Sequence, residues 1–145
     1  MSLKVKIKRL HKDSVIPNYS KDGDAGMDLT AISREFDQTN NVWVFNTGLS
    51  FEIPKGYVGL LFPRSSIYKQ DLILSNSVGV LDSGYRGEVL FKFKKSVTKG
   101  VEYQYNVGDR IGQIIILPYP QIEFEEVDEL SETERGTGGY GSTGK

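Results

Sequence analysis

Apolar and polar residues alternate along several stretches of the chain. The alternation has a period of two, which places one face of a β-strand on a core and the other in solvent. It occurs in residues 3–7, 49–53, 89–93 and 101–105. Continuous apolar runs, typical of strands buried on both faces, occupy residues 42–45, 57–62 and 111–117. The pattern predicts a strand in each of these places.

Turn-forming residues separate the expected strands. They occur at Lys21–Asp24, Pro54–Gly56, Lys99–Gly100 and Asn106–Asp109. Many short strands at this spacing predict an all-β protein, built as a sandwich or a barrel. The sequence has no long apolar pattern of helical period, and the one helix we expect is a turn or two at residues 65–69, after Pro63.

The C-terminal part of the chain changes character. Residues 123–134 hold seven carboxylates and no Lys or Arg, and we expect a last strand there, followed by a solvated arm. The arm leads to a glycine-rich tail, Arg135–Gly144, which carries a guanidinium, one aromatic ring and hydroxyls. Because glycine loses much backbone entropy on ordering, this tail is either a frayed end or a clamp for a phosphorylated ligand.

Composition and charge exclude several classes of protein. The 145 residues fit one domain, and a formal net charge of −1 argues against a general nucleic-acid binder. With no cysteine and one histidine, His11, the chain cannot form disulfides, thiolate metal sites or histidine-based triads. It has neither a signal-peptide pattern nor an apolar run of membrane-spanning length. We therefore expect a cytoplasmic protein that binds neither membranes nor nucleic acid.

The segment Gly79–Glu88 combines glycines with an acid and an aromatic ring. Its glycines permit tight turns that would fold the segment into a hairpin around a small ligand. Asp82 would then stand at the mouth of the loop, and Tyr85 would offer a flat face beside it. The simpler alternative is a polar hairpin in which Asp82 only forms the turn.

A second polar segment opens the expected helix. Arg64, Ser65 and Ser66 follow Pro63 directly. Free backbone N–H groups at a helix N-terminus, together with two hydroxyls and a guanidinium, would bind an anion. The alternative is a serine-capped helix start with a surface arginine.

Two further segments place polar groups at the ends of expected strands. Arg110 and Gln113 are either donors to a phosphate or ordinary polar strand residues. Asp28, in Ala25–Leu29, is a catalytic, a metal-linked or a strand-edge carboxylate. The residues themselves leave these alternatives open.

Taken in order, five segments of the chain resemble the five sequence motifs of the homotrimeric dUTP pyrophosphatase (dUTPase) family. They are Ala25–Leu29, Pro63–Ser66, Gly79–Glu88, Arg110–Gln113 and Arg135–Gly144. The third and fifth motifs are highly specific, and together the motifs span residues 25–144. One departure is Tyr140, which stands where the family most often has Phe and keeps the flat face of that side chain.

The resemblance implies a jelly-roll-like β fold, a distorted barrel or sandwich with one short helix. It implies a β domain over residues 1–130 and a flexible C-terminal arm over residues 131–145 that carries the fifth motif. It also implies hydrolysis of dUTP to dUMP and pyrophosphate with Mg²⁺, in a homotrimer whose active sites each draw on several chains.

The resemblance further assigns roles to single residues. Asp82 would activate water for attack on the α-phosphorus, Arg135 would offset charge on the phosphates, and Asp28 would contact Mg²⁺ through water. The nucleoside would be bound by Asn76, Val80, Leu81, Asp82, Tyr85 and Leu90, with Tyr85 leaving no room for a 2′-hydroxyl. The phosphates would be held by Arg64, Ser65, Ser66 and Gln113. The tail would cover the substrate with Tyr140, Gly141, Ser142 and Thr143.

Two other functions fit the same expected fold. A dCTP deaminase shares much of the third motif, but its catalytic glutamate would fall on Lys92 in this chain. A non-catalytic nucleotide-binding regulator is the second, because a fold alone does not determine a function. Such a regulator would be expected to lack Asp82 or the tail, and this chain has both.

Overall fold

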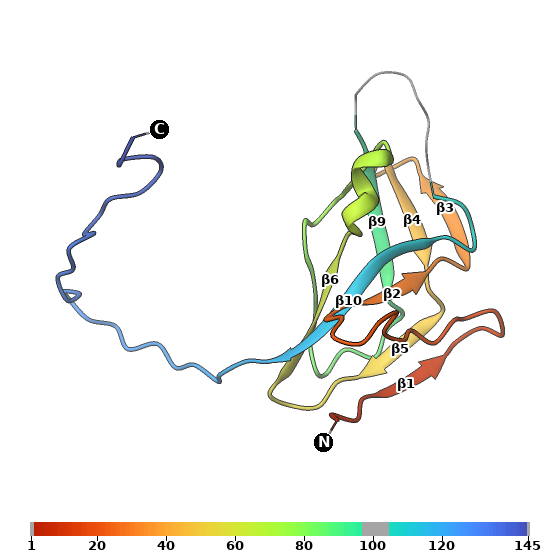
Figure 1. The fold of residues 1–145 in the computed structure, drawn as a ribbon, viewed down its shortest axis with the longest axis horizontal. Coiled ribbons are helices and arrows are strands. Elements are labelled where there is room, and N and C mark those ends of the chain that lie inside the picture. The colour runs from red at the N-terminus through yellow and green to blue at the C-terminus, as the bar shows by residue number, and fades with distance from the viewer. Residues whose placement is uncertain (1, 97–104, 145) are drawn as a thin grey trace.

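The computed structural model describes residues 2–96 and 105–144, and these form three antiparallel sheets (Figure 1). The first four-stranded sheet has the order β2 (Met27–Thr30), β10 (Arg110–Pro118), β6 (Tyr57–Phe62), β8 (Gly79–Leu81). The second has the order β3 (Ser33–Asp37), β4 (Val42–Asn46), β9 (Leu90–Lys95), β7 (Leu72–Leu74). Strands β1 (Lys6–Arg9) and β5 (Leu49–Glu52) pair with each other. The all-β prediction is confirmed.

One hydrophobic core joins the three sheets. It contains Leu29 and Ile114 from the first sheet, Phe45 and Phe93 from the second, and Leu49 from β5. The rings of Phe45 and Phe93 meet edge-on with centroids 5.6 Å apart, a geometry that aromatic pairs prefer. The core fixes the strands from which the site residues project.

Most of the expected strands are present. The apolar run at residues 57–62 is β6 with the same bounds, and the runs at 42–45 and 111–117 are β4 and β10. The expected helix is confirmed as a short 3₁₀ helix, η1 (Ser65–Lys69). The strand expected at residues 101–105 lies almost wholly outside the described residues. Strands β2, β3, β7 and β8 were not predicted.

The segment Gly79–Glu88 does not fold into a hairpin of its own, so that expectation was wrong. Strand β8 pairs with β6, whereas β9 pairs with β4 and β7. The residues between β8 and β9 therefore cross from one sheet to the other. Asp82 and Tyr85 lie on this crossing segment, and both are exposed.

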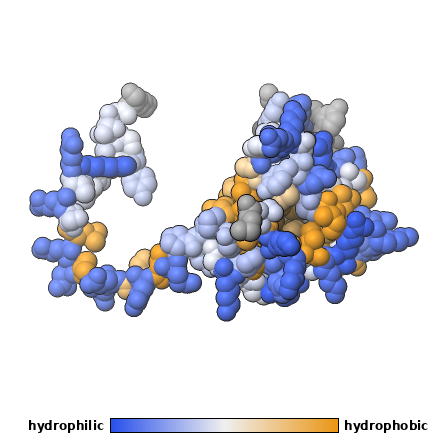
Figure 2. All heavy atoms as spheres, turned by 60° about the horizontal axis from the view of Figure 1, so that its bottom comes forward, coloured by the Kyte–Doolittle hydropathy of each residue, from blue (hydrophilic) through white to orange (hydrophobic). Residues whose placement is uncertain are grey.

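The chain leaves the β fold after β10, where the Tyr119 N–H donates to the carbonyl of Gly56 at 3.0 Å. No strand forms between residues 119 and 144, all of which are described, so the last strand expected at 123–134 was wrong. Its carboxylates repel one another, and its apolar residues have no surface to cover: Phe124 is 90% exposed and Leu130 is 87% exposed. The arm extends away from the sheets (Figure 1), with isolated apolar residues among hydrophilic ones (Figure 2). The domain division at residue 130 stays a prediction.

Within residues 2–96 and 105–144, no helix has the length and apolar character needed to cross a membrane.

The contact between Gly112 on β10 and the Phe91 ring on β9 yields a stability prediction. A Cβ at residue 112 would overlap the Phe91 ring, which is buried and stacked on Phe93, and so cannot move aside. We expect Gly112→Ala to lower the free energy of unfolding by about 2 kcal/mol. Urea unfolding at one fixed protein concentration measures the change.

The matched control is Gly139→Ala on the arm, where an added Cβ meets no atom within 4 Å. It should change the free energy of unfolding by less than about 0.5 kcal/mol. Equal effects of the two substitutions would contradict the packing of β9 against β10.

Candidate active site

A first cavity of about 410 Å³ opens beside the crossing between β8 and β9. Its lining brings together all the residues that the sequence assigned to the nucleoside: Asn76, Val80, Leu81, Asp82, Tyr85 and Leu90. Asp82 is exposed at the turn that follows β8, while Leu81 is buried at the end of that strand. An exposed carboxylate beside an apolar wall and an aromatic ring can bind a small ring compound and act on a group next to it.

Backbone geometry places Asp82 and Tyr85 side by side. The Tyr85 N–H donates to the Asp82 carbonyl at 3.0 Å and closes a turn, and the Tyr85 hydroxyl donates to the Glu88 carbonyl at 3.1 Å. A Cβ at Gly87 would overlap the Tyr85 ring, so glycine is needed there for the ring to lie across the chain. The turn and the ring are thus positioned together.

Glu88 ties this loop to the turn between β4 and β5. Its carboxylate accepts hydrogen bonds from the Gly48 N–H at 2.8 Å and from the Asn46 side-chain amide at 3.0 Å. In the same turn, the Thr47 hydroxyl donates a hydrogen bond to the Val89 carbonyl at 2.8 Å. Sequence reasoning did not single out Glu88 as a support, because its partners lie some forty positions away in the chain.

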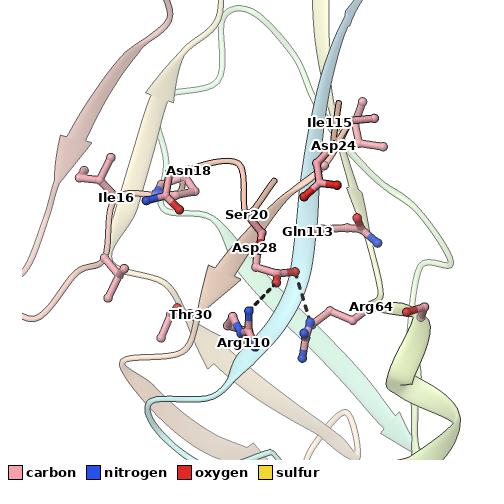
Figure 3. A pocket seen from close by; sticks show the side chains of 15 residues that line it. Ile16, Asn18, Ser20, Asp24, Asp28, Thr30, Arg64, Arg110, Gln113 and Ile115 are labelled. Carbon is pink, nitrogen blue, oxygen red and sulfur yellow. Dashed lines mark hydrogen bonds and ion pairs between the residues drawn. The ribbon is translucent and has the colours of Figure 1, made fainter. Parts of the chain in front are cut away.

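A second cavity of about 540 Å³ lies at the other edge of the first sheet, over β2 and β10. Figure 3 shows Asp28 on β2 pointing between two guanidinium groups. The Asp28 carboxylate pairs with Arg64 Nε at 3.2 Å and with Arg110 Nη1 at 3.3 Å. One carboxylate therefore neutralises part of the charge of two arginines. Asp24 also lines the cavity, so its two arginines are matched by two carboxylates, and the guanidinium donors rather than a net positive charge would bind phosphate oxygens.

Only some of the other residues expected to bind phosphate line this cavity. Ser65 and Gln113 line it, whereas Ser66 is not among its lining residues. The Gln113 side chain donates to the Pro63 carbonyl at 3.1 Å, which fixes the chain just before Arg64. Residues Val15–Asn18 complete the wall, and sequence reasoning missed them because they carry no motif.

Burial changes the titration of one group near this cavity. Burial raises the pKa of the Tyr105 hydroxyl, and the charges of Asp109 and Asp28 add to the rise while Arg64 opposes it. Tyr105 therefore stays protonated at neutral pH and contributes no negative charge beside Arg64.

The side chains set limits on how a metal ion can bind. In the described part of the chain, no three His, Cys, Asp or Glu residues cluster as metal ligands. Mg²⁺ commonly uses one or two carboxylates, keeps several waters and takes its other ligands from substrate phosphates. Asp28, half-buried and already shared by two arginines, fits contact with such an ion through water. The residues present fit Mg²⁺ that arrives with a phosphorylated substrate.

The tail residues expected over the substrate lie apart from both cavities. They are Arg135, Tyr140, Gly141, Ser142 and Thr143, and none lines either cavity. Arg135 Nε donates instead to the Gly138 carbonyl at 2.9 Å, and the Tyr140 ring is fully exposed. This chain does not bring its own tail to its own cavities.

Comparison with known proteins identifies the family: the chain belongs to the dUTPase family, whose sequence profile matches residues 12–144. The deoxyuridine 5′-triphosphate nucleotidohydrolase of Nautilia profundicola is 40% identical over 144 residues, covering 99% of this chain and 100% of that protein. The enzyme of the same description from Picosynechococcus sp. is 36% identical over 144 residues, covering 97% of this chain and 98% of that protein.

A solved structure supports the fold. A mutant of the dUTPase of Staphylococcus bacteriophage 80alpha, determined with dUpNHpp, has a TM-score of 0.76 to this chain at 24% identity. The match covers 99% of this chain and 100% of the phage chain. The jelly-roll-like fold implied by the sequence motifs is confirmed.

The Glu88 contacts lead to a second stability prediction. Glu88→Ala would remove the acceptor for both the Gly48 N–H and the Asn46 amide. Because each hydrogen bond to a charged group is worth about 1.5–3 kcal/mol, we expect a loss of at least about 2 kcal/mol in the free energy of unfolding. The control, Glu123→Ala on the exposed arm, should change it by less than about 0.5 kcal/mol. Unfolding midpoints that do not separate the two variants would show that Glu88 does not hold the loop.

Proposed function

We propose that the chain hydrolyses dUTP to dUMP and pyrophosphate. The observation that carries the proposal is the Asp82 carboxylate at the mouth of a cavity lined by Asn76 and Tyr85, in a chain of the dUTPase family. In the reaction a water oxygen attacks the α-phosphorus and the bond to the bridging oxygen of the leaving pyrophosphate breaks. Asp82 accepts the proton that the water loses.

The first cavity selects the base and the sugar. The Asn76 amide and the backbone of Val80 to Asp82 offer hydrogen-bonding groups for the edge of uracil. The edge of cytosine would leave some of these groups without a partner. Tyr85 packs against the deoxyribose and leaves no room for a 2′-hydroxyl. Leu90 adds an apolar contact. These roles follow from the family motif and are supported by the common cavity.

The second cavity and the tail bind the phosphates. Arg64, Ser65 and Gln113 are the expected phosphate donors that line this cavity, and we assign Ser66 to the same helix start. Arg135 would bind the phosphate chain, Tyr140 would cover uracil, and Gly141, Ser142 and Thr143 would close on the γ-phosphate. Phosphoryl chemistry depends mainly on positioning and charge neutralisation, which this donor set supplies.

Mg²⁺, when bound with the nucleotide, would neutralise phosphate charge and align the triphosphate. Asp28 would hold it through water, and the two arginines that share Asp28 keep this carboxylate in place.

We further propose a homotrimer in which each active site uses several chains. The two cavities share no lining residue and lie at opposite edges of one sheet, and the tail reaches neither. A nucleoside in the cavity of one chain would meet the phosphate donors of a second chain and the tail of another. We place this activity in the cytoplasm, with deoxynucleotide metabolism.

The competing functions lack support at the site. Lys92, at the position of the deaminase glutamate, lines the first cavity and offers no acid–base carboxylate there. Asp82 and the tail are both present, which disfavours a non-catalytic regulator.

Incubation with dUTP, dCTP and UTP, with pyrophosphate measured, tests the proposal. We expect pyrophosphate from dUTP alone. Release of ammonia from dCTP would support the deaminase, and binding of dUTP without any product would support the regulator.

Asp82→Asn should abolish dUTP turnover, because the amide cannot accept a proton from water at neutral pH. Binding of a non-hydrolysable dUTP analogue should stay within about tenfold of the wild type, since the amide keeps the size of the carboxylate. Calorimetric titration with the analogue and pyrophosphate release with dUTP measure the two effects. Loss of binding together with turnover would mean that Asp82 is mainly structural.

Mixing two inactive variants tests the shared site. Asp82→Asn inactivates the first cavity and Arg64→Ala inactivates the second. Unfolding and refolding the two variants together should therefore restore sites that take Asp82 from one chain and Arg64 from another. Random assembly makes about a quarter of the sites intact, and turnover should recover to that share. Each variant refolded alone is the control. A mixture no more active than its components would contradict sharing between chains.

A further inference from the structure

The side chain of Arg86 folds back on the turn that carries Asp82. Its Nη1 donates to the Ser83 carbonyl at 2.7 Å and is 3.3 Å from the Tyr85 carbonyl. The same turn is closed from within by the Tyr85 N–H, which donates to the Asp82 carbonyl at 3.0 Å. The guanidinium therefore joins both sides of the turn and restricts how Asp82 and Tyr85 can move relative to each other.

Glu52, the last residue of β5, holds the other end of the guanidinium. Arg86 Nη2 lies 3.5 Å from Glu52 Oε1, and Lys6 Nζ on β1 lies 2.7 Å from Glu52 Oε2. The hydrogen bond from Lys6 and its charge lower the pKa of Glu52, and Arg86 adds to the lowering. Glu52 is therefore ionised at neutral pH, and it connects the turn to the β1–β5 sheet.

These contacts are poor candidates for a stabilising role. The side chains of Arg86 and Glu52 are 54% and 43% exposed, and exposed ion pairs contribute little to the free energy of unfolding. Catalysis is far more sensitive to such contacts, because a displacement of about 1 Å at a reacting group can cost a hundredfold in rate. The geometry is thus better suited to orientation than to stability.

We propose that Arg86, anchored by Glu52, is a positioning residue that holds the Asp82 turn in its reactive orientation. Arg86 acts through the backbone of Ser83 and Tyr85, and its guanidinium makes no contact with the Asp82 carboxylate. The inference rests on the proposed function for its kinetic consequence, but its structural consequence for the turn stands without it.

Steady-state kinetics with dUTP test the kinetic part. For Arg86→Ala we expect kcat to fall about tenfold, with KM within about threefold and the melting temperature nearly unchanged. Arg86→Lys should recover part of the loss, because an ammonium can still donate to the Ser83 carbonyl. The control is Lys6→Ala, which removes the shorter ion pair of Glu52 and leaves the Arg86 contacts with the turn. It should keep kcat within about twofold.

Amide hydrogen exchange, followed by NMR without substrate, tests the structural part. The Tyr85 N–H should exchange about tenfold faster in Arg86→Ala, because the turn opens more often. The Ser142 N–H, which closes a separate turn onto Gly139 on the arm, should not change.

Unchanged kcat together with unchanged Tyr85 exchange in Arg86→Ala would overturn the proposal. A fall in kcat matched by a large fall in melting temperature would also overturn it, since Arg86 would then be structural. A wild-type chain without dUTP turnover would contradict the proposed function instead, and the exchange of Tyr85 would still decide the role of Arg86.

Discussion

The pairing of β10 with two neighbours is the constraint on which the second cavity depends. In the register of the sheet, Gln113 stands opposite Asp28 on β2 and opposite Phe62 on β6. Strands in a sheet lie about 4.8 Å apart, so this register brings the carboxylate, the amide and the chain leading to Arg64 within reach of one another. A slip of one residue would turn these side chains to the other face and leave two arginines without their shared carboxylate.

The first cavity is built in a different way. Val80 and Leu81 on β8 and Leu90 on β9 are held by strand pairing, but Asp82 and Tyr85 lie where the chain crosses between these two strands, and no strand register holds the crossing. Side chains do this instead: Glu88 binds the β4–β5 turn, and Arg86 binds the backbone of the Asp82 turn. The charged residues of the second cavity therefore inherit the rigidity of a sheet, while the Asp82 and Tyr85 side of the first cavity depends on a few polar contacts.

The sequence predicted the parts of this architecture that are local. Residues 57–62 could be recognised as a strand because an apolar run lies between Gly56 and Pro63. The pairing of Arg110 with Asp28 could not be found, because 82 positions separate them and only the register of β10 with β2 brings them together. The strand expected in the acidic arm was wrong for a related reason, since a segment forms a strand only where another strand is available to pair with it. The candidate site was found by motif, and its division into two cavities required the fold.

The composition of the arm has a consequence for proteolysis. Arg135 is the only Lys or Arg between residues 111 and 144, and every residue from 119 to 136 is exposed. Exposed chain of this kind is where proteases cut most readily. A protease specific for basic residues would find one site on the arm, directly after Arg135. A single cut there would remove Tyr140 and the hydroxyls of the tail while leaving both cavities intact, and the arm would remain on the body as an acidic tether.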